Sequence, residues 1–370
     1  MQSTLRLARD VRATALLRQG LSAENLASYI VQRRRWMTRL ESCRGDYWPD
    51  AGSSAIALDR RVRSGAGGYM VRGVLGDGAQ SKAFWIKWCP EADPRALEQS
   101  IRHMHWWEMR YPQLARFVPK LIDYWRDENA LLIEGVEGVP VGQLLSQDAP
   151  ELPTAIQAVA RWHYEYSQIG DVDVTELDTL LGSEVHRTPE GALHVRADRL
   201  IESRIALASE AAYQLSLAGC KAARQWSDRY DISRAVSYFS TDVPAGFVHG
   251  DFKPDNVLVN GATFSVIDWW TAPRVSWPLC DVAVFAANLW MDPRRDAADA
   301  VWQNFVHARF PDGIDAYAQY GIDILATMTC IQYLANRCSK ARPIDRVYCK
   351  KALDRLLTRR YPIGRVVSPA

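Results

Sequence analysis

Residues 248–256 read Val-His-Gly-Asp-Phe-Lys-Pro-Asp-Asn, and this is the most informative stretch of the chain. It contains an acid, Asp251, and an amide, Asn256, with four residues between them. A second acid, Asp268, closes the sequence Val-Ile-Asp further along the chain. One carboxylate near two further oxygen-bearing side chains is typical of chemistry that needs both a base and a bound metal ion.

The segment between Asn256 and Asp268 predicts a β-hairpin. Two β-forming runs flank Asn260 and Gly261. Asn-Gly between such runs is the strongest short-range hairpin signal, because both turn residues tolerate positive φ. The hairpin would return the chain to its starting side, so we expect Asn256 and Asp268 to share a metal ion near the preceding acid. The alternative is an ordinary hairpin that carries surface acids.

The composition is that of an ordinary soluble globular protein, with 48% hydrophobic and 24% charged residues. A chain of 370 residues suits about two domains, each large enough to bury a core. The formal net charge of +2 is too small to indicate a general affinity for nucleic acid or for an anionic membrane. We therefore expect neither among its partners, and the oligomeric state is left open.

The cysteines and the first residues favour a cytoplasmic location. The seven cysteines are scattered without a C-x-x-C pair, as expected of thiols in a reducing compartment. No apolar run reaches the roughly 20 residues of a membrane helix. Residues 1–10 lack the continuous apolar core of an export signal. Because this start is rich in arginine, an organelle address is the alternative to a plain surface helix.

Residues 1–54 are predicted to form a basic, helical N-terminal extension. Arg33, Arg34 and Arg35 precede Trp36 within it. Three arginines on one helix favour a solvated face, and contact with RNA or acidic lipid is the alternative.

Residues 55–136 change to a β pattern. Glycine-rich turns at 64–68 and 76–78 connect the first strands into an antiparallel meander. The pattern predicts a five-stranded sheet with one inserted helix. The expected strands are 56–62, 69–75, 83–88, 118–125 and 130–134, and the expected helix is 94–110.

Residues 137–370 are predicted to be mainly helical, interrupted by β signals only at the 256–268 hairpin. The fold class is therefore α+β, with a small antiparallel β-rich domain, a linker near 135–140, and a larger α-rich domain. The expected helices are roughly 152–168, 197–238, 281–291, 295–309, 315–338 and 343–360.

The turn Gly-Ala-Gly-Gly at 65–68 is a candidate phosphate-binding loop. Gly65, Gly67 and Gly68 lack a Cβ, so backbone N–H groups there can approach phosphate oxygens. A simple hairpin turn is the alternative. Lys87 ends a hydrophobic strand, as expected of a lysine that neutralises nucleotide phosphates, although a surface lysine would also fit.

Glu108 is the predicted partner that holds Lys87 in position, and Glu98 is the rival. We prefer Glu108 because the residues after it lead directly into the next predicted strand.

Several motifs together resemble the aminoglycoside phosphotransferase and choline-kinase-like branch of the protein-kinase-like fold. The resemblance covers about residues 55–310. The motifs are His249-Gly250-Asp251-x4-Asn256, Ile267-Asp268-Trp269 and Pro278-x2-Asp281-x-Ala283, supported by Ala160-Arg161-Trp162-His163.

The resemblance implies a bilobal kinase-like enzyme that uses ATP or GTP, Mg²⁺ and a small hydroxylated acceptor. Asp251 would be the catalytic base, a role typically worth about 10²–10⁴-fold in rate. Lys253 would reach the γ-phosphate, while Asn256 and Asp268 would bind the metal. For Asp281 we prefer a structural role, as the N-cap of the next helix.

The acceptor itself stays open among sugars, amino alcohols and antibiotics. Lys253 stands where many small-molecule members of the family have histidine, so a protein kinase is one alternative. No Ala-Pro-Glu segment follows Asp268, which argues against that alternative. A catalytically silent nucleotide-binding relative is the other.

Overall fold

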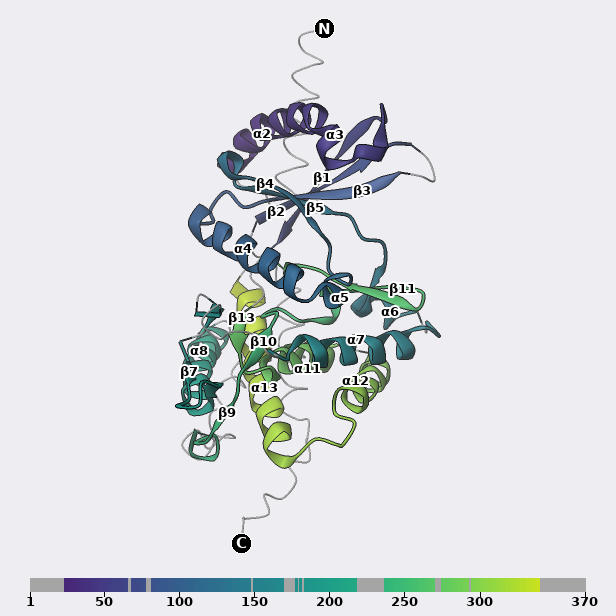
Figure 1. Cartoon of the computed structure of the whole chain (residues 1–370). Coiled ribbons are helices and arrows are strands. Elements are labelled where there is room, and N and C mark those ends of the chain that lie inside the picture. The colour runs from purple at the N-terminus through teal and green to yellow at the C-terminus, as the bar shows by residue number, and fades with distance from the viewer. Residues whose placement is uncertain are drawn as a thin grey trace. The chain divides into compact units, whose positions relative to one another are not determined.

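The computed structural model describes residues 23–65, 68–77, 81–147, 149–169, 177–178, 180–181, 183–217, 236–269, 274–292 and 294–339 (Figure 1). The chain forms two compact units. The first comprises Met1–Arg102 and Val118–Glu137, and the second comprises His103–Phe117 and Gly138–Ala370.

The first unit contains the predicted five-stranded antiparallel sheet, in the order β1-β2-β3-β5-β4. In β2 the buried Val71, Gly73 and Leu75 alternate with less buried residues, because successive side chains of a strand point to opposite faces. The strands are β1 (Ile56–Gly65), β2 (Gly68–Leu75), β3 (Lys82–Trp88), β4 (Leu121–Trp125) and β5 (Ala130–Glu134), with α4 (Pro94–Arg110) between β3 and β4 and η3 (Arg126–Glu128) between β4 and β5.

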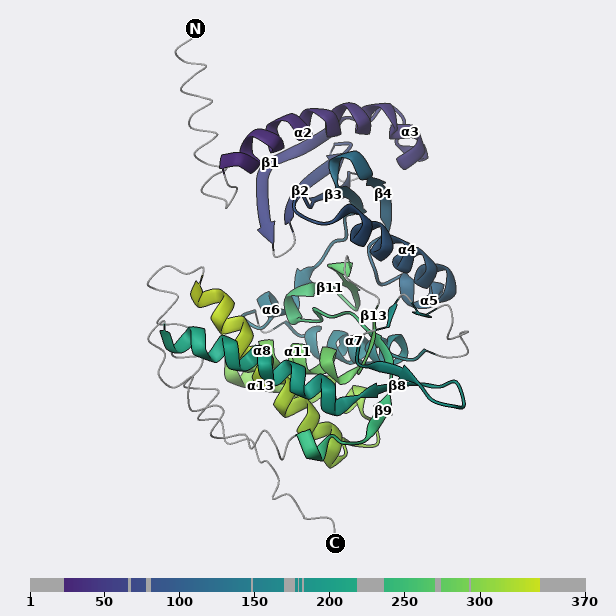
Figure 2. The same ribbon diagram turned by 90° about the vertical axis from the view of Figure 1, so that its left-hand side faces the viewer.

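The helix α2 (Ala23–Ser42) lies across this sheet (Figure 2). Its Tyr29, Trp36 and Leu40 are buried in one core with aromatic and aliphatic residues of the strands. Their spacing of seven and four residues places them on one helix face. Arg33 donates hydrogen bonds to strand β1, so the predicted solvated arginine face is wrong for this residue.

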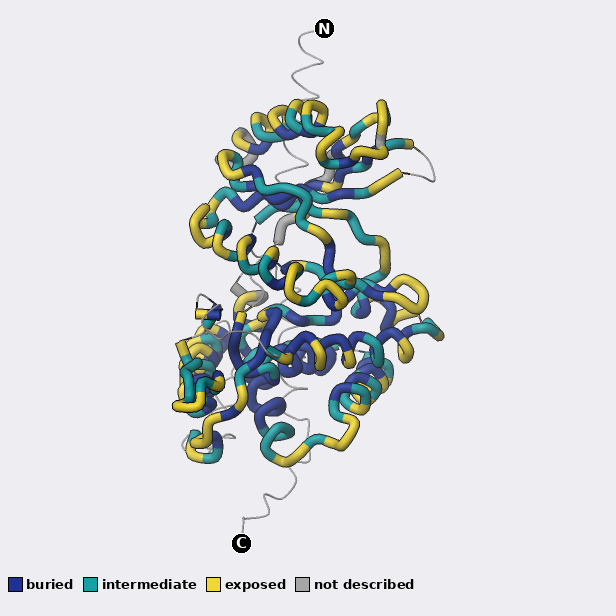
Figure 3. The backbone as a smooth tube through the Cα atoms, in the orientation of Figure 1, coloured by how far each residue is buried: buried dark blue, intermediate teal, exposed yellow. Residues whose placement is uncertain are grey.

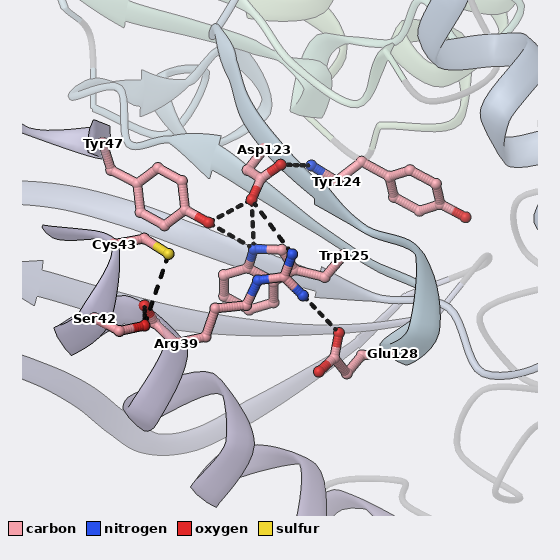
Figure 4. Close-up of polar contacts among 8 residues, drawn as sticks. All are labelled: Arg39, Ser42, Cys43, Tyr47, Asp123, Tyr124, Trp125 and Glu128. Carbon is pink, nitrogen blue, oxygen red and sulfur yellow. Dashed lines mark hydrogen bonds and ion pairs between the residues drawn. The ribbon is translucent and has the colours of Figure 1, made fainter.

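A polar network attaches the end of this helical region to β4 (Figure 4). The Tyr47 hydroxyl, on α3 (Arg44–Tyr47), donates to Asp123 Oδ2, and the Trp125 Nε1 donates to the same oxygen over 2.9 Å. The Arg39 Nη1 donates to Glu128 Oε2 over 3.2 Å. Burial, and then the bond to Asp123, raises the pKa of Tyr47 to about 12. The short helix η1 (Pro49–Ala51) then leads to the sheet.

The second unit is built around helices. In it α7 packs against α12, and α13 packs against both α8 and α11. Helix α11 is almost wholly buried, and the tube in this region of Figure 3 is largely dark blue. The helices are α5 (Pro112–Ala115), α6 (Val141–Leu144), α7 (Leu152–Tyr166), α8 (Ala197–Leu217), α11 (Leu279–Met291), α12 (Arg295–Arg309) and α13 (Ala316–Ser339).

The predicted hairpin is confirmed as β11 (Val257–Asn260) and β12 (Thr263–Val266). A third strand, β6 (Val139–Pro140), pairs with β11 on its other side. The expectation that no other strands interrupt the helices is wrong. The second unit also contains β7 (Val185–Arg187), β8 (Leu193–Arg196) and β9 (Asp242–Pro244) in one sheet, and β10 (Gly246–Val248) with β13 (Arg274–Ser276) in another.

The predicted helix 197–238 is confirmed over its described first part, which is α8 (Ala197–Leu217). Residues 218–235, and the predicted helix 343–360, lie outside the described residues. None of the helices in the described ranges combines the length and apolar character needed to cross a bilayer.

Candidate active site

The loop that follows β10 depends on the glycine at its second position. Gly250 has φ +84°, a left-handed conformation that only glycine adopts at little cost. No atom lies within 4 Å of the place where a Cβ would stand, so the backbone conformation, and not space, requires glycine here. This conformation lets two successive N–H groups donate to one side chain.

That side chain is Asp281, which is fully buried in the first turn of α11. Its Oδ2 accepts from the His249 N–H over 2.6 Å, and its Oδ1 accepts from the Gly250 N–H over 2.8 Å. The N-cap prediction for Asp281 is wrong, because Pro278 occupies that position and no side chain caps the helix. Bonds to an ionised acceptor are stronger than neutral ones, so Asp281 anchors the loop.

Asp251 lies at the centre of a small polar cluster. The Asn256 Nδ2 donates to Asp251 Oδ2 over 3.0 Å and to its backbone oxygen over 2.9 Å. The Lys253 Nζ lies 2.6 Å from the same Oδ2. The Asp251 side chain is 42% exposed, so the carboxylate is open to solvent. The short helix η6 (Pro254–Asn256) brings the amide back to the acid.

The hairpin returns the chain to this cluster. The Ile267 N–H donates to the Asn256 carbonyl over 2.9 Å, and the exposed Asp268 follows immediately. Asp268 has φ +71°, which is uncommon for a non-glycine residue. The next residue, Trp269, is buried, donates to the Val266 carbonyl over 2.7 Å, and so fixes the backbone beside Asp268.

His249 connects the two halves of the site. Its Nδ1 accepts from the Asp251 N–H over 3.3 Å, and its Nε2 donates to the Ile267 carbonyl over 3.1 Å. Burial lowers the pKa of His249, although nearby carboxylates oppose the shift. A neutral ring with its proton on Nε2 satisfies both bonds. His249 thus shapes the loop through two backbone groups.

The side chains present fit a small divalent cation. Because the Asn256 amide nitrogen faces Asp251, its Oδ1 is directed away from that acid. Asn256 and Asp268 would then offer oxygen ligands of the kind that Mg²⁺ takes together with substrate phosphates, and this role stays a prediction. Within the described residues, no three His, Cys, Asp or Glu side chains gather as an all-protein metal site.

The candidate phosphate loop belongs to the first unit. Gly65 pairs with Gly68 at the end of the β1–β2 hairpin, while Gly67 lies outside the described residues. Gly68 has φ +145°, and a Cβ there would stand 2.2 Å from the Trp88 carbonyl oxygen. Packing alone therefore requires glycine at Gly68, whatever the loop binds.

Lys87 occupies the middle of the sheet. It pairs in register with Met70 and Leu131 and is only 7% exposed. The surface-lysine alternative is therefore wrong, since a buried ammonium group is uncommon and needs partners.

The two candidate glutamates differ in their surroundings. Glu98 forms ion pairs with Arg126 at 2.7 Å and Arg102 at 3.9 Å. Glu108 lies on the part of α4 in the second unit, with its Oε2 3.6 Å from the His105 Nδ1. Pairing of Lys87 with Glu108 stays a prediction.

Sequence analysis missed the way His163 contributes. Its fully buried ring lies on α7, with Nε2 3.5 Å from Asp281 Oδ2, and it stacks 4.8 Å from the Phe252 ring in the loop. The only signal was the Ala-Arg-Trp-His sequence that ends at this residue.

Comparison with known structures shows the same fold. The ADP-bound aminoglycoside phosphotransferase APH(2'')-Ib is 13% identical, with 85% of this chain and 95% of that chain covered and a TM-score of 0.50. A choline/ethanolamine kinase family protein from Mesorhizobium loti is 12% identical, with 87% and 94% covered and a TM-score of 0.48. Aminoglycoside phosphotransferase APH(4)-Ia is 16% identical, with 86% of this chain and 98% of that chain covered and a TM-score of 0.48.

No curated protein matches the sequence at a significant level. A sequence model of the phosphotransferase enzyme family matches residues 60–320, which is most of the chain and includes the Asp251 loop and the hairpin. The chain therefore belongs to the phosphotransferase enzyme family and has the protein-kinase-like α+β fold of the aminoglycoside phosphotransferases.

Proposed function

We propose that this phosphotransferase moves the γ-phosphoryl group of ATP or GTP to a hydroxyl of a small molecule, with Mg²⁺. The acceptor class is a sugar, an amino alcohol or an antibiotic. The observation that supports the proposal is the bond from Asn256 to Asp251, together with the hairpin that returns Ile267, the residue before Asp268, to the Asn256 carbonyl.

Asp251 would act on the acceptor. Its exposed carboxylate accepts the hydroxyl proton as the acceptor oxygen bonds to the γ-phosphorus and the bond to the β-phosphate oxygen breaks. Lys253, which pairs with this carboxylate at 2.6 Å, would turn to the γ-phosphate when substrates bind. Asn256 and Asp268 would hold the cation. When it is bound, its positive charge would offset the negative charge of the phosphates.

The nucleotide would contact residues of the first unit. Gly65, Gly67 and Gly68 would present backbone N–H groups to phosphates, and Lys87, positioned by Glu108, would neutralise them. The ADP in the APH(2'')-Ib structure supports nucleotide binding by a protein of this fold. In terms of chain segments, 55–136 would serve the nucleotide and 137–370 the acceptor, with 1–54 as an extension. The scattered cysteines support a cytoplasmic location.

A transfer screen tests the proposal. The full-length chain is incubated with Mg²⁺, with ATP or GTP, and with panels of sugars, amino alcohols and antibiotics. The molecular mass of each acceptor is then measured to detect the gain of one phosphoryl group. Modification by the wild type and not by Asp251→Asn supports the proposal. No modified small molecule, together with phosphorylation of a generic protein substrate, would overturn it.

The protein-kinase alternative rests on one observation, the lysine in Phe-Lys-Pro-Asp-Asn at 252–256. A silent nucleotide-binding relative is the other alternative. Thermal stabilisation by Mg²⁺ and ATP without any transfer or hydrolysis would favour the silent relative.

A further inference from the structure

Arg309, the last residue of α12, is a buried cation of unusual surroundings. It is only 7% exposed, and its guanidinium lies over the rings of Tyr164 at 4.7 Å and Phe310 at 5.0 Å. A buried charge normally has a charged partner. Among the ion pairs of the described residues, however, none involves Arg309. Burial lowers the pKa of Arg309 to about 10.

Its hydrogen bonds go to two uncharged side chains at the end of α7, one on the helix and one on its C-cap residue. The Arg309 Nε donates to His163 Nδ1 over 3.1 Å, and the Nη2 donates to Ser167 Oγ over 3.1 Å. A guanidinium can only donate, so His163 Nδ1 must be the acceptor. The imidazole proton of a neutral His163 is therefore on Nε2, and this assignment follows from chemistry alone.

The protonated nitrogen faces the anchor of the catalytic loop. His163 Nε2 lies 3.5 Å from Asp281 Oδ2, a long separation that we treat as a charge–dipole contact. Three buried side chains thus form a line of cation, neutral imidazole and carboxylate. Protonation of His163 would set its Nδ1–H against the donor of Arg309, and burial, assisted by the charge of Arg309, lowers the pKa of His163.

We propose that Arg309 is a positioning residue of the phosphotransfer site, which acts by fixing the tautomer and the orientation of His163. The ring so fixed contacts the loop twice, through Asp281 and through its stack on Phe252, the residue next to Asp251. Its effect on catalysis rests on the proposed function, whereas its effect on the histidine and on the loop backbone does not.

Loss of the two donors has a specific consequence. In Arg309→Met the shape is roughly kept, but the buried His163 Nδ1 loses its donor, and with it the bond that holds the ring in one orientation. A ring that turns no longer presents its Nε2–H to Asp281 Oδ2, which loosens the bonds from the His249 and Gly250 N–H groups to that carboxylate. Arg309→Lys keeps the charge and one donor, so it should recover part of the effect.

The first test needs no acceptor, and a variant serves only to assign one signal. Nitrogen NMR of the full-length chain labelled with ¹⁵N-histidine distinguishes the two neutral tautomers and the imidazolium, and the signal of His163 is assigned by its loss in His163→Asn. We expect the Nε2–H tautomer at pH 7. A His163 with its proton on Nδ1, or protonated at both nitrogens, overturns the proposal.

The second test is amide hydrogen exchange at His249 and Gly250, compared with strand β2 as an internal reference. We expect faster exchange at these two amides in Arg309→Met, with β2 unchanged, and an intermediate rate in Arg309→Lys. Arg161→Gln is the matched control, because Arg161 is an exposed arginine on the same helix as His163. Unchanged exchange in a folded Arg309→Met overturns the proposal.

The third test uses Mg²⁺ and ATP with an acceptor found in the screen. We expect kcat to fall on the order of tenfold in Arg309→Met with KM for ATP nearly unchanged, as for residues that support the groups doing chemistry. An unaltered kcat overturns the catalytic part. If the wild type transfers nothing, the proposed function fails, while the NMR and exchange tests still decide the role of Arg309.

Discussion

The two units solve the problem of buried polar groups differently. In the first, Tyr47, Asp123 and Arg39 meet in a half-buried network in which a cation and carboxylates lie within ion-pair distance (Figure 4). In the second, Arg309 and Asp281 are buried more deeply and are separated by the ring of His163. The first network joins a helix to a sheet, whereas the second holds a loop that carries a candidate base. We expect the ion pairs of the first network to stabilise the fold, and the neutral His163 ring of the second to orient the loop.

The largest expected effect is on Asp251 itself. Asp251→Asn removes the proposed base and should lower the rate of transfer about 10²–10⁴-fold. The side chain is 42% exposed, so the free energy of unfolding should change little. Initial rates and urea unfolding of the same preparation measure both quantities. Unimpaired transfer would remove the base from the mechanism.

Asp281→Ala should affect both stability and rate. It leaves the N–H groups of the buried His249 and the exposed Gly250 without their acceptor, at a cost of about 1–3 kcal/mol for the buried one. Urea unfolding and initial rates provide the measurement. Asp296→Ala is the control, because that acid is exposed in the first turn of α12. Equal losses in the two variants would contradict an anchoring role.

The two networks should lose their contributions to the free energy of unfolding at opposite ends of the pH scale. Folding lowers the pKa of His163 and His249 from 6.5, so their contribution is present above that pH and is lost as pH falls through the folded values. Folding raises the pKa of Tyr47 from 10.0 to about 12, so its contribution is lost as pH rises between those values.

Unfolding free energies measured from pH 5 to 12 test this difference. His163→Gln should flatten the acid side of the curve, and Tyr47→Phe should flatten the alkaline side. A profile that neither variant changes would show that the titrating groups lie elsewhere.

The smallest effect is expected in the first unit. Tyr47→Phe removes the hydroxyl bonded to Asp123 and should lower the free energy of unfolding by about 1 kcal/mol without changing the transfer rate. Tyr124→Phe is a matched control, since its hydroxyl makes only a long 3.4 Å contact with Asn129. A loss of transfer in Tyr47→Phe would mean that this network also serves the site.

Local patterns predicted the parts of the molecule that local physics determines. The Asn260-Gly261 turn specified the hairpin, and glycine turns with alternating residues specified the five-stranded sheet. The strands β7 to β9 escaped prediction because segments of three or four residues show no period. The catalytic, metal and nucleotide roles of the named residues stay predictions.

Long-range contacts were beyond such patterns. Arg309 and His163 are separated by 146 positions, and no local sequence pattern near either residue predicts their contact. Asp281 looked like a helix cap because an acid near a helix start often is one. Its actual partners lie on a loop about thirty residues earlier, and only the packed structure brings them together.

The bond between α2 and β1 bears on how the protein can be shortened. The pairing of β1 with β2 is irregular between Leu58 and Val62. There the Arg33 side chain donates hydrogen bonds to the Leu58 and Asp59 carbonyls. Because β1 is the outermost strand, a chain that starts at residue 55 would present an uncovered edge and bare aromatic rings. Such a truncated chain should self-associate through that edge, which size-exclusion chromatography would reveal as aggregates.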